Sequence, residues 1–290
     1  MTGGAAPLSG RSTKGHSPPV IEYILDPFQY SFMVRALIVS VLVGAMCPII
    51  GAYVIARGRS FMGDALAHSV LPGMVVAFML GFSPFMAAVP AGVGVAALMG
   101  FISRRTGVSE DTSIGIVFAG MFALGLTMLA TAEGITVNVE DLLLGQVLGV
   151  STTDVYVSLG LAALVIAGLY AIHRAAVYTT FDPASAEVVG IPVRLVDYAL
   201  LTLLALVIVI GIQAAGIVLV MAMLVTPAAA GYLLARRFVD GMIIGAIIGS
   251  MSAVVGLYLS YYMNIPSGPA MVFITTGVFA IAAAFKRRVF

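Results

Sequence analysis

The sequence predicts an all-α polytopic membrane protein with about nine transmembrane helices. Of its 290 residues, 61% are hydrophobic and only 9% are charged, whereas soluble domains carry roughly a quarter charged residues. Many of its apolar runs reach about 20 residues, the length that a helix needs to cross a hydrocarbon core of about 30 Å. Glycine is abundant, at 32 residues, as expected where helices pack closely in lipid. A water-facing surface cannot be built from this composition.

The polar N-terminus and the single cysteine narrow the architecture further. Residues 1–27 are polar and rich in Gly, Ser and Pro, so we expect a disordered arm, followed by one transmembrane domain at 28–290. The arm contains no apolar stretch of the kind that signal peptides have. Cys47 is the only cysteine, which excludes an intrachain disulfide and any CxxC metal or redox motif. The net charge of +1 gives no sign of a nucleic-acid partner, and we expect none.

The spans follow the charge-free stretches in order along the chain. We expect them at 28–56, 60–81, 84–103, 112–133, 153–173, 195–213, 215–235, 241–263 and 269–285. The sixth and seventh are separated only by a short interruption at 211–216. In the eighth, Gly241, Gly245 and Gly249 form a doubled GxxxG pattern, which predicts a close helix-packing face.

The positive charges predict the orientation. Eleven of the 14 Lys and Arg residues fall on one side of the expected spans: Arg57, Arg59, Arg104, Arg105, Arg174, Arg194, Arg236, Arg237, Lys286, Arg287 and Arg288. The loops on the opposite side carry none. By the positive-inside rule, we expect the N-terminus outside and the C-terminus in the cytoplasm of a bacterial-type plasma membrane, with an odd number of spans.

Two segments between spans are too short to cross the bilayer. Residues 139–151 (VEDLLLGQVLGVS) are amphipathic, so we expect them at the outer interface or re-entering the membrane. Residues 181–191 (FDPASAEVVGI) lie on the inner side and predict a short capped helix. Asp182 suits the N-cap, Pro183 suits the first helical position, and Gly190 suits the exit of the helix.

An aspartate and a histidine interrupt the second apolar span, in GDALAHSVLPG (63–73). The i, i+4 spacing puts Asp64 and His68 on one helical face, within reach of one ion or of each other. His68 lies nine residues from Arg59, or about 13 Å from the cytosolic edge, near mid-membrane. Pro72 lacks the N–H that would bond the carbonyl of residue 68, so we expect a helix break there that leaves the carbonyl free.

Two interpretations of this pair stay open. The two side chains can bond each other or a neighbouring helix and only fix the packing. Alternatively, they form a transient site for a divalent cation, because ionisable groups at membrane depth are costly and usually functional. Carboxylate plus imidazole suits Mn(II), Fe(II) or Zn(II), while Cu(I) prefers thiolate. Two ligands from one chain leave the site open, which suits passage rather than storage, and a symmetric pair of chains would supply four.

Other polar features have simpler explanations. We expect Glu140 and Asp141 to be solvated loop charges rather than an entry or docking site. His173 falls at a predicted helix end, where it can satisfy terminal carbonyls. The chain has no GxxxxGK[ST] phosphate loop and no HExxH pair. If the protein is a pump, its motor is therefore on another chain.

Five segments resemble the corresponding segments of ABC-type manganese and zinc importer permeases: 57–73 (RGRSFMGDALAHSVLPG), 142–151 (LLLGQVLGVS), 181–191, 214–229 (AAGIVLVMAMLVTPAA) and 265–272 (IPSGPAMV). The similarity extends over residues 28–286. It implies the fold of type II ABC importers, which is the class of the cobalamin importer. In this fold, two permease chains surround a central path, so the resemblance implies a homodimer in the lipid bilayer.

The resemblance also implies partners and roles for named residues. It implies cytosolic ABC ATPase subunits, an extracytoplasmic metal-binding protein, and an ion path lined by Asp64 and His68. It implies that Glu140 and Asp141 dock the binding protein or form part of an outer gate. The form VLPG, with Pro72, is more like the manganese and iron branch than the zinc branch. Coupling to the ATPase falls to the capped segment, at Phe181, Asp182, Pro183, Glu187 and Gly190.

The sequence therefore predicts a permease subunit that moves a divalent metal into the cytoplasm, Mn(II) first and then Zn(II) or Fe(II). No permanently bound cofactor is expected, and ATP hydrolysis is expected on a separate chain. The alternative is a secondary carrier that uses an ion gradient, with Asp64 and His68 as a proton relay. Copurification of an ATPase would distinguish the two. An intramembrane enzyme is a poor third choice, because no nucleophile–base set is visible in the spans.

Overall fold

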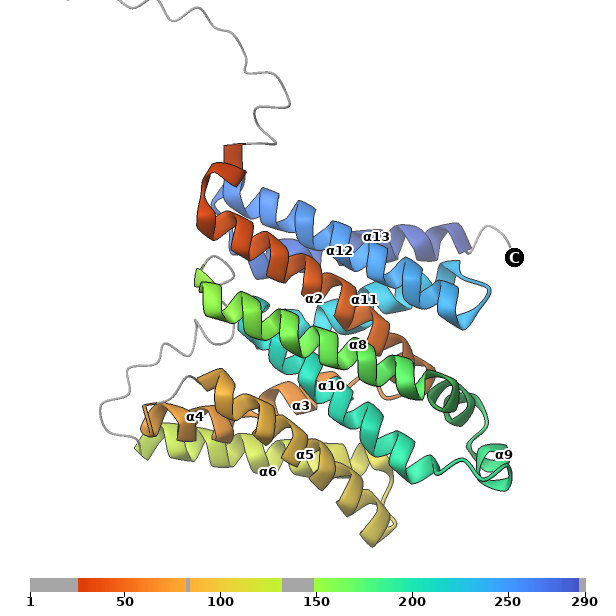
Figure 1. The fold of residues 1–290 in the computed structure, drawn as a ribbon. Coiled ribbons are helices and arrows are strands. Elements are labelled where there is room, and N and C mark those ends of the chain that lie inside the picture. The colour runs from red at the N-terminus through yellow and green to blue at the C-terminus, as the bar shows by residue number, and fades with distance from the viewer. Residues whose placement is uncertain (1–25, 82–83, 132–148, 287–290) are drawn as a thin grey trace, which may run out of the picture.

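The computed structural model describes residues 26–81, 84–131 and 149–286, and every regular element within these ranges is a helix (Figure 1). In chain order the elements are η1 (Asp26–Gln29), α2 (Ser31–Ala56), α3 (Met62–Ser69), α4 (Leu71–Met79), α5 (Pro84–Thr106), α6 (Glu110–Thr131), α8 (Thr152–Phe181), α9 (Pro183–Val188), α10 (Val193–Ala215), α11 (Ile217–Leu234), α12 (Phe238–Met263) and α13 (Ser267–Lys286).

The described part of the chain supplies enough apolar helix for the expected topology. It contains eight segments that are long and apolar enough to cross a membrane, counting α3 and α4 together as one. The 18-residue α11 runs beside them as a further apolar helix. Helix η1 and the end of α13 lie at opposite ends of the bundle (Figure 1), an arrangement that an odd number of spans would produce.

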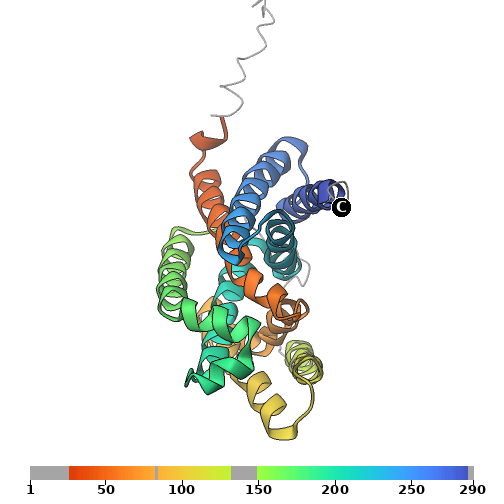
Figure 2. The ribbon, with the colours of Figure 1, turned by 90° about the vertical axis from the view of Figure 1, so that its right-hand side faces the viewer.

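The helices form two groups that are joined through α10. The helices α2, α11, α12 and α13 pack on one another, and α3, α4, α5 and α6 form the second group. Figures 1 and 2 show these groups on opposite sides of the molecule. Between them, α10 contacts α2, α5, α8 and α11. Its central position explains its burial, since 72% of its apolar stretch is buried, compared with 17% for the peripheral α6.

Small residues let α2 and α12 approach backbone to backbone. A Cβ on Gly249 would overlap the carbonyl oxygen of Gly44, and a Cβ on Gly44 would lie 2.6 Å from the carbonyl oxygen of Gly249. A Cβ on Gly245 would lie 3.0 Å from the carbonyl oxygen of Pro227. The predicted packing face is thus confirmed at Gly245 and Gly249. At Gly241 a Cβ would make only an ordinary 3.5 Å contact.

Two helix ends test the predicted span boundaries, one at Gly216 and one at the end of α8. The interruption between the sixth and seventh spans is confirmed at Gly216, whose φ of 79° is one that residues with a Cβ rarely adopt. The fifth span was predicted to end at 173 but α8 continues to Phe181. This prediction was wrong because charge marks where a helix leaves lipid, and a helix can continue into water beyond Arg174.

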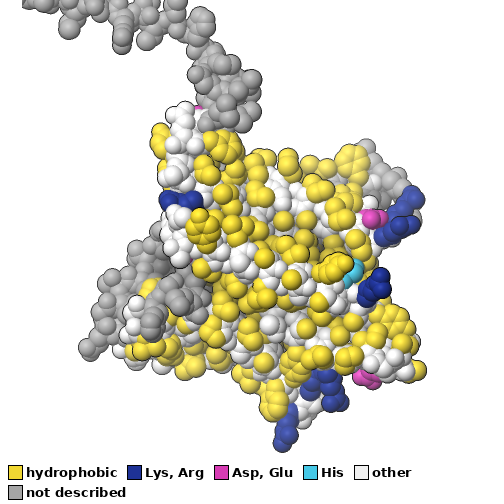
Figure 3. Space-filling model, viewed as in Figure 1, with side chains coloured by type: hydrophobic (Ala, Val, Ile, Leu, Met, Phe, Trp, Pro, Cys, Tyr) yellow, Lys and Arg dark blue, Asp and Glu magenta, His cyan; other side chains and the backbone are white. Residues whose placement is uncertain are grey.

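Arginine side chains gather at one end of the bundle. Figure 3 shows the dark blue side chains mainly along its right-hand and lower right edges, where Figure 1 places the ends of α5 and α8. This clustering is the three-dimensional form of the charge bias in the sequence. We call it the arginine end, and its location in the cytoplasm stays a prediction of the positive-inside rule.

The tight α2–α12 contact predicts that Gly249→Ala is destabilising. The new methyl group must displace backbone rather than a flexible side chain, and overpacking of this kind typically costs about 1–3 kcal/mol. Thermal unfolding of the purified protein in detergent should show a lower Tm for this variant. Gly160→Ala is the matched control, because a Cβ at this α8 position meets nothing within 4 Å. Equal melting temperatures for the two variants would contradict the packing argument.

Candidate functional site

The short helix α3 begins and ends for identifiable reasons. A turn leads into it, in which the N–H of Met62 bonds the carbonyl of Arg59 at 2.9 Å. The helix ends at Ser69, and α4 starts at Leu71 with Pro72 in its first turn. The predicted break is thus confirmed and lies at Val70. The expectation of a free carbonyl at His68 was wrong, because the N–H of Val70 turns back and bonds it.

Asp64 and His68 are the two residues of α3 that are not buried. Their side chains keep 22% and 17% of their exposure. The Nδ1 atom of His68 lies 3.3 Å from Oδ1 of Asp64 and 3.0 Å from the Asp64 backbone carbonyl oxygen. The structure therefore confirms that the pair shares one face and that the two groups reach each other.

These contacts decide which imidazole nitrogen is free. Both neighbours of Nδ1 are oxygen acceptors, so the neutral ring of His68 keeps its proton on Nδ1 and donates it to Asp64. The lone pair is then on Nε2, for which the described residues offer no hydrogen-bond partner. A histidine held in this way by an oxygen at one nitrogen and open at the other has the arrangement of a metal ligand.

Aromatic side chains hold the ring of His68 in place. The imidazole meets Phe118 and Phe122 of α6 edge to face, with ring centroids 5.7 and 5.4 Å apart. Phe118 also contacts Phe61, which lies in the turn before α3, with ring centroids 5.9 Å apart. The phenyl rings cover one side of the imidazole and limit its rotation. The pair is thereby oriented by packing as well as by its own hydrogen bond.

One chain does not complete a metal site. Within the described ranges, no three His, Cys, Asp or Glu residues come together at a spacing that could hold an ion. Asp64 and His68 also bond only each other there, without a polar contact to a neighbouring helix. The contact of the two side chains with each other is thus observed, and their role as metal ligands stays a prediction. The geometry suits two ligands that need further ligands from outside the described chain.

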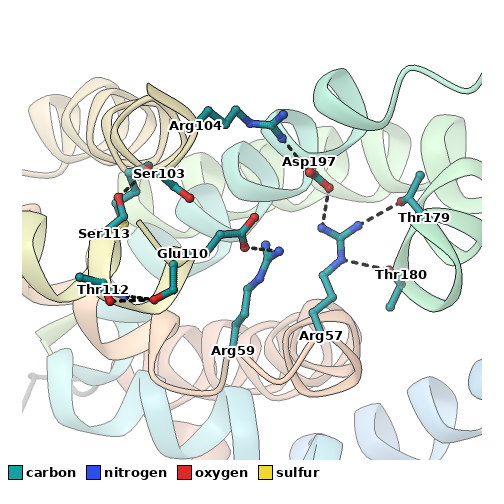
Figure 4. Close-up of polar contacts among 12 residues, drawn as sticks. Arg57, Arg59, Ser103, Arg104, Glu110, Thr112, Ser113, Thr179, Thr180 and Asp197 are labelled. Atoms are coloured by element: carbon teal, nitrogen blue, oxygen red, sulfur yellow. Dashed lines mark hydrogen bonds and ion pairs between the residues drawn. The ribbon is translucent and has the colours of Figure 1, made fainter. Parts of the chain in front are cut away.

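A second polar cluster lies at the arginine end (Figure 4). Arg57 donates from Nη1 to Asp197 at 2.7 Å, from Nη2 to Thr179 at 3.1 Å and from Nε to Thr180 at 3.1 Å. The second carboxylate oxygen of Asp197 accepts from Arg104 at 2.8 Å. Five side chains from α5, α8, α10 and the turn after α2 thus form one network.

The neighbouring arginines extend these contacts. Arg59 forms an ion pair with Glu110 at the start of α6, and the guanidinium of Arg104 lies 5.3 Å over the ring of Tyr198. Sequence reasoning used the arginines only as signs of orientation and missed their partners. The available signal was Asp197, an acidic residue just inside an apolar span, but which arginines reach it depends on the tertiary packing.

His173 has a different role from the one predicted. Its Nδ1 lies 2.6 Å from the hydroxyl of Tyr53 on α2, and the helix continues past it. The prediction that it satisfies terminal carbonyls was therefore wrong, because the helix does not end there. Instead the contact links α8 to α2 beside the Arg57 cluster.

The predicted capped helix at 181–191 is confirmed as α9. The N–H of Ser185 donates to Oδ1 of Asp182 at 2.9 Å, Pro183 is the first helical residue, and Gly190 leaves the helix with a φ of 86°. Phe181, Glu187 and Gly190 are exposed, and the apolar side chains of Val188 and Val189 are 88% and 69% exposed. This is a surface that a partner protein could cover. Its role in coupling stays a prediction.

The proposed outer elements are only partly visible. Glu140 and Asp141 lie outside the described residues, as does most of the amphipathic segment 139–151. At its end, Ser151 and Asp154 form a reciprocal capping box that starts α8. Near this cap, Arg35 donates to Thr152 at 3.2 Å.

Comparisons with known proteins agree on one family. Residues 29–286 match the profile of the ABC 3 transport family. The manganese transport system membrane protein MntC of Halalkalibacterium halodurans is 42% identical over 257 residues, which cover 89% of this chain and 88% of that protein. The chelated iron transport system membrane protein YfeD of Yersinia pestis is 35% identical over 263 residues, 91% of this chain and 88% of that protein.

A solved structure supports the same relationship. The chain superposes on a chain of PsaBC from Streptococcus pneumoniae, solved in complex with Fab, with a TM-score of 0.81 and 32% sequence identity. The match covers 91% of this chain and 95% of that one.

The capped geometry of α9 predicts that Asp182→Ala loosens this helix while Asp182→Asn does not, because Asn is an equally good N-cap. The Ser185 hydroxyl and N–H hold the pKa of the Asp182 carboxyl below its ordinary value. This cap therefore contributes stability above the ordinary aspartate pKa, which is lost as the pH falls through the lowered value. Hydrogen exchange should be faster at Ser185 in the Ala variant. Equal exchange rates in both variants would argue against the cap.

Proposed function

Because the chain belongs to the ABC 3 transport family, we propose that it is the permease subunit of an ATP-binding-cassette importer that moves a divalent transition metal into the cytoplasm. The importer-permease fold predicted from the sequence is confirmed by the superposition. The chain is a transport subunit and not a catalytic enzyme, and ABC importers hydrolyse ATP on a separate ATPase. Family membership thus sets aside the alternative of a gradient-driven secondary carrier.

The observation that carries the proposal is the partly exposed pair on an otherwise buried helix. Asp64 and His68 lie in the first half of the second span, Met62–Met79, and six apolar or small residues around them in α3 are buried. Ionisable groups at such depth are expensive unless they are paired, hydrated or used. A carboxylate next to an imidazole with an open Nε2 meets the needs of a divalent ion.

A second copy of the chain would complete the site. The pair reaches the surface of a single chain, beside the peripheral helix α6. In a symmetric dimer, two Asp64–His68 pairs would face one path and supply two carboxylates and two imidazoles. Four ligands from two chains hold an ion briefly, and a small relative movement of the chains weakens all of them together. This property suits transport better than storage.

The partners follow from the orientation. With the arginine end in the cytoplasm, α9 faces the cytosolic ATPase subunits, and its exposed Val188 and Val189 lie against them. The opposite end receives the ion from an extracytoplasmic metal-binding protein, with Glu140 and Asp141 as candidate docking or gate residues. Asp64 offsets part of the cost of carrying a dication through a low dielectric. Closure of the ATPases moves α9 and opens the inner side.

Mn(II) is the first choice of metal, ahead of Zn(II) and Fe(II). The MntC protein that is 42% identical is named for manganese, and the YfeD protein that is 35% identical for chelated iron. One oxygen and one nitrogen ligand per chain suit all three ions, so the ligand types alone do not choose between them. The preference for Mn(II) rests on the relatives and on the VLPG form around Pro72.

Replacing the proposed carboxylate ligand should stop transport. In proteoliposomes that contain the permease, its ATPase and its binding protein, Asp64→Asn should lower ATP-dependent Mn(II) uptake at least about tenfold, since even changes around a metal ligand cost about 10–100-fold. The variant should still assemble with the ATPase. Asp240→Asn is the control, because this exposed carboxylate at the start of α12 is far along the chain from α3. Normal Mn(II) uptake by the folded Asp64→Asn variant would contradict the proposal that Asp64 is a metal ligand.

The ligand set also predicts how selectivity can be shifted. Imidazole suits Zn(II) well, whereas Mn(II) accepts oxygen ligands readily. The wild-type transporter should accumulate Mn(II), and excess Zn(II) should inhibit this uptake. His68→Asp should reduce inhibition by Zn(II) more than it reduces Mn(II) uptake. Preferential accumulation of Zn(II) by the wild type would instead reverse the order of metals.

A further inference from the structure

We propose that Arg57 and Asp197 are positioning residues that join the ATPase-facing helix α9 to the metal-bearing helix α3, so that movement of α9 is transmitted to Asp64 and His68. This inference rests on the proposed function and adds the connection between its two working parts. The α9 segment and α3 are far apart in the sequence, and no hydrogen bond or ion pair joins them directly in the described part of the chain. The contacts of Arg57 supply one.

Arg57 reaches both helices that hold α9. Thr179 and Thr180 lie in the last turn of α8, just before the Asp182 cap, and Asp197 lies in the first turns of α10, just after α9. The guanidinium bonds all three side chains, at 2.7 to 3.1 Å. Arg57 itself stands in the turn that leads from α2 into α3. One side chain thus spans the base of α9 and the entry to α3 (Figure 4).

These contacts are directional and shielded from water. The side chains of Arg57 and Asp197 are only 10% and 15% exposed. The hydroxyls of Thr179 and Thr180 donate to the carbonyl of Ala176, so their lone pairs are directed at the guanidinium. A planar guanidinium with three fixed acceptors has little freedom to follow one helix and not the others. The ends of α8 and α10 therefore cannot shift far without moving the turn or breaking its bonds.

The same turn is held from the other side by α6. Arg59, two residues beyond Arg57, pairs with Glu110 at the start of α6. Helix α6 carries Phe118 and Phe122, the two rings that pack on His68. Displacement of the turn thus reaches His68 by two routes: along the chain through α3, and through the helix whose phenyl rings orient the imidazole.

Asp197 shares its charge between two helices. One carboxylate oxygen accepts from Arg57 and the other from Arg104 at the end of α5, which packs against α4. Loss of this single negative charge leaves two guanidiniums facing each other without their shared acceptor. Removing Asp197 should therefore weaken the polar link of α10 to the turn before α3 and to α5, while the direct packing of α10 on both helices remains.

The test is the number of metal ions moved per ATP hydrolysed. The complete transporter, with its ATPase and binding protein, is reconstituted in proteoliposomes, and Mn(II) uptake and phosphate release are measured together. Asp197→Asn and Arg57→Gln should keep hydrolysing ATP while the ratio of Mn(II) to ATP falls about tenfold, a loss typical of energetic coupling between distant sites. Arg57→Lys keeps the charge but not the three-way geometry, so the ratio should fall by an intermediate amount.

Matched variants separate coupling from general damage. Arg105 is the exposed neighbour of Arg104, and unlike Arg104 it has no polar contact in the part of the chain that the structure describes. Arg105→Gln should therefore leave the ratio unchanged. Thr180→Val removes one contact of Arg57 without changing charge or size much, and it keeps the proposal testable if the charge variants do not assemble. Binding of Mn(II) to the permease without nucleotide should be unchanged in every variant.

The outcomes are distinct from those that test the proposed function. A normal Mn(II) to ATP ratio in folded Asp197→Asn would contradict the proposed coupling role of Arg57 and Asp197, and would not contradict the importer function. If Asp197→Asn does not assemble, a normal ratio in Thr180→Val would do the same. A wild type that accumulates no metal with ATP would overturn the proposed function itself. If the variants bind Mn(II) more weakly in the absence of nucleotide, these residues shape the metal site directly. That result would also contradict their role in transmitting movement from α9 to α3.

Discussion

A hydrocarbon core offers no hydrogen-bond partners, so each polar group that a chain places there has to be satisfied by the protein or by what it carries. Helices meet this demand for the backbone, and the described residues form helices throughout the apolar ranges. The breaks that remain are small and compensated. At Val70 the chain turns between α3 and α4, and the N–H of Val70 bonds the carbonyl of His68. The same demand explains the side-chain pairs.

Two polar clusters satisfy their polar groups in opposite ways. At the arginine end, Arg57 makes its three contacts with groups of the same chain, which ties together three parts of the fold: the turn after α2, α8 and α10. On α3, His68 satisfies only Nδ1 within the chain. One cluster is satisfied within the chain, whereas the other leaves Nε2 of His68 without a hydrogen-bond partner among the described residues. An importer that couples distant ATP hydrolysis to ion release needs both kinds of cluster.

Several features were predictable because they depend on local chemistry. Charge-free length predicts a helical span, and nearly all predicted spans fall within a few residues of the observed helices. The cap of α9 follows from Asp182, Pro183 and Gly190, which act within one turn of the backbone. The shared face of Asp64 and His68 follows from helical spacing alone. Errors arose where an end was inferred from charge, as at residue 173, since a helix that leaves the lipid does not have to stop.

The sequence by itself determined the membrane class, the spans, the capped helix and the candidate ion-binding pair, because each depends on hydrophobic length, on backbone geometry or on spacing within one helix. Only the tertiary structure decided which arginine meets Asp197, that Tyr53 rather than a helix end receives His173, and that Phe118 and Phe122 hold the imidazole of His68. These contacts join residues more than 50 positions apart in most cases. They depend on how whole helices pack, which no local pattern in a single sequence specifies.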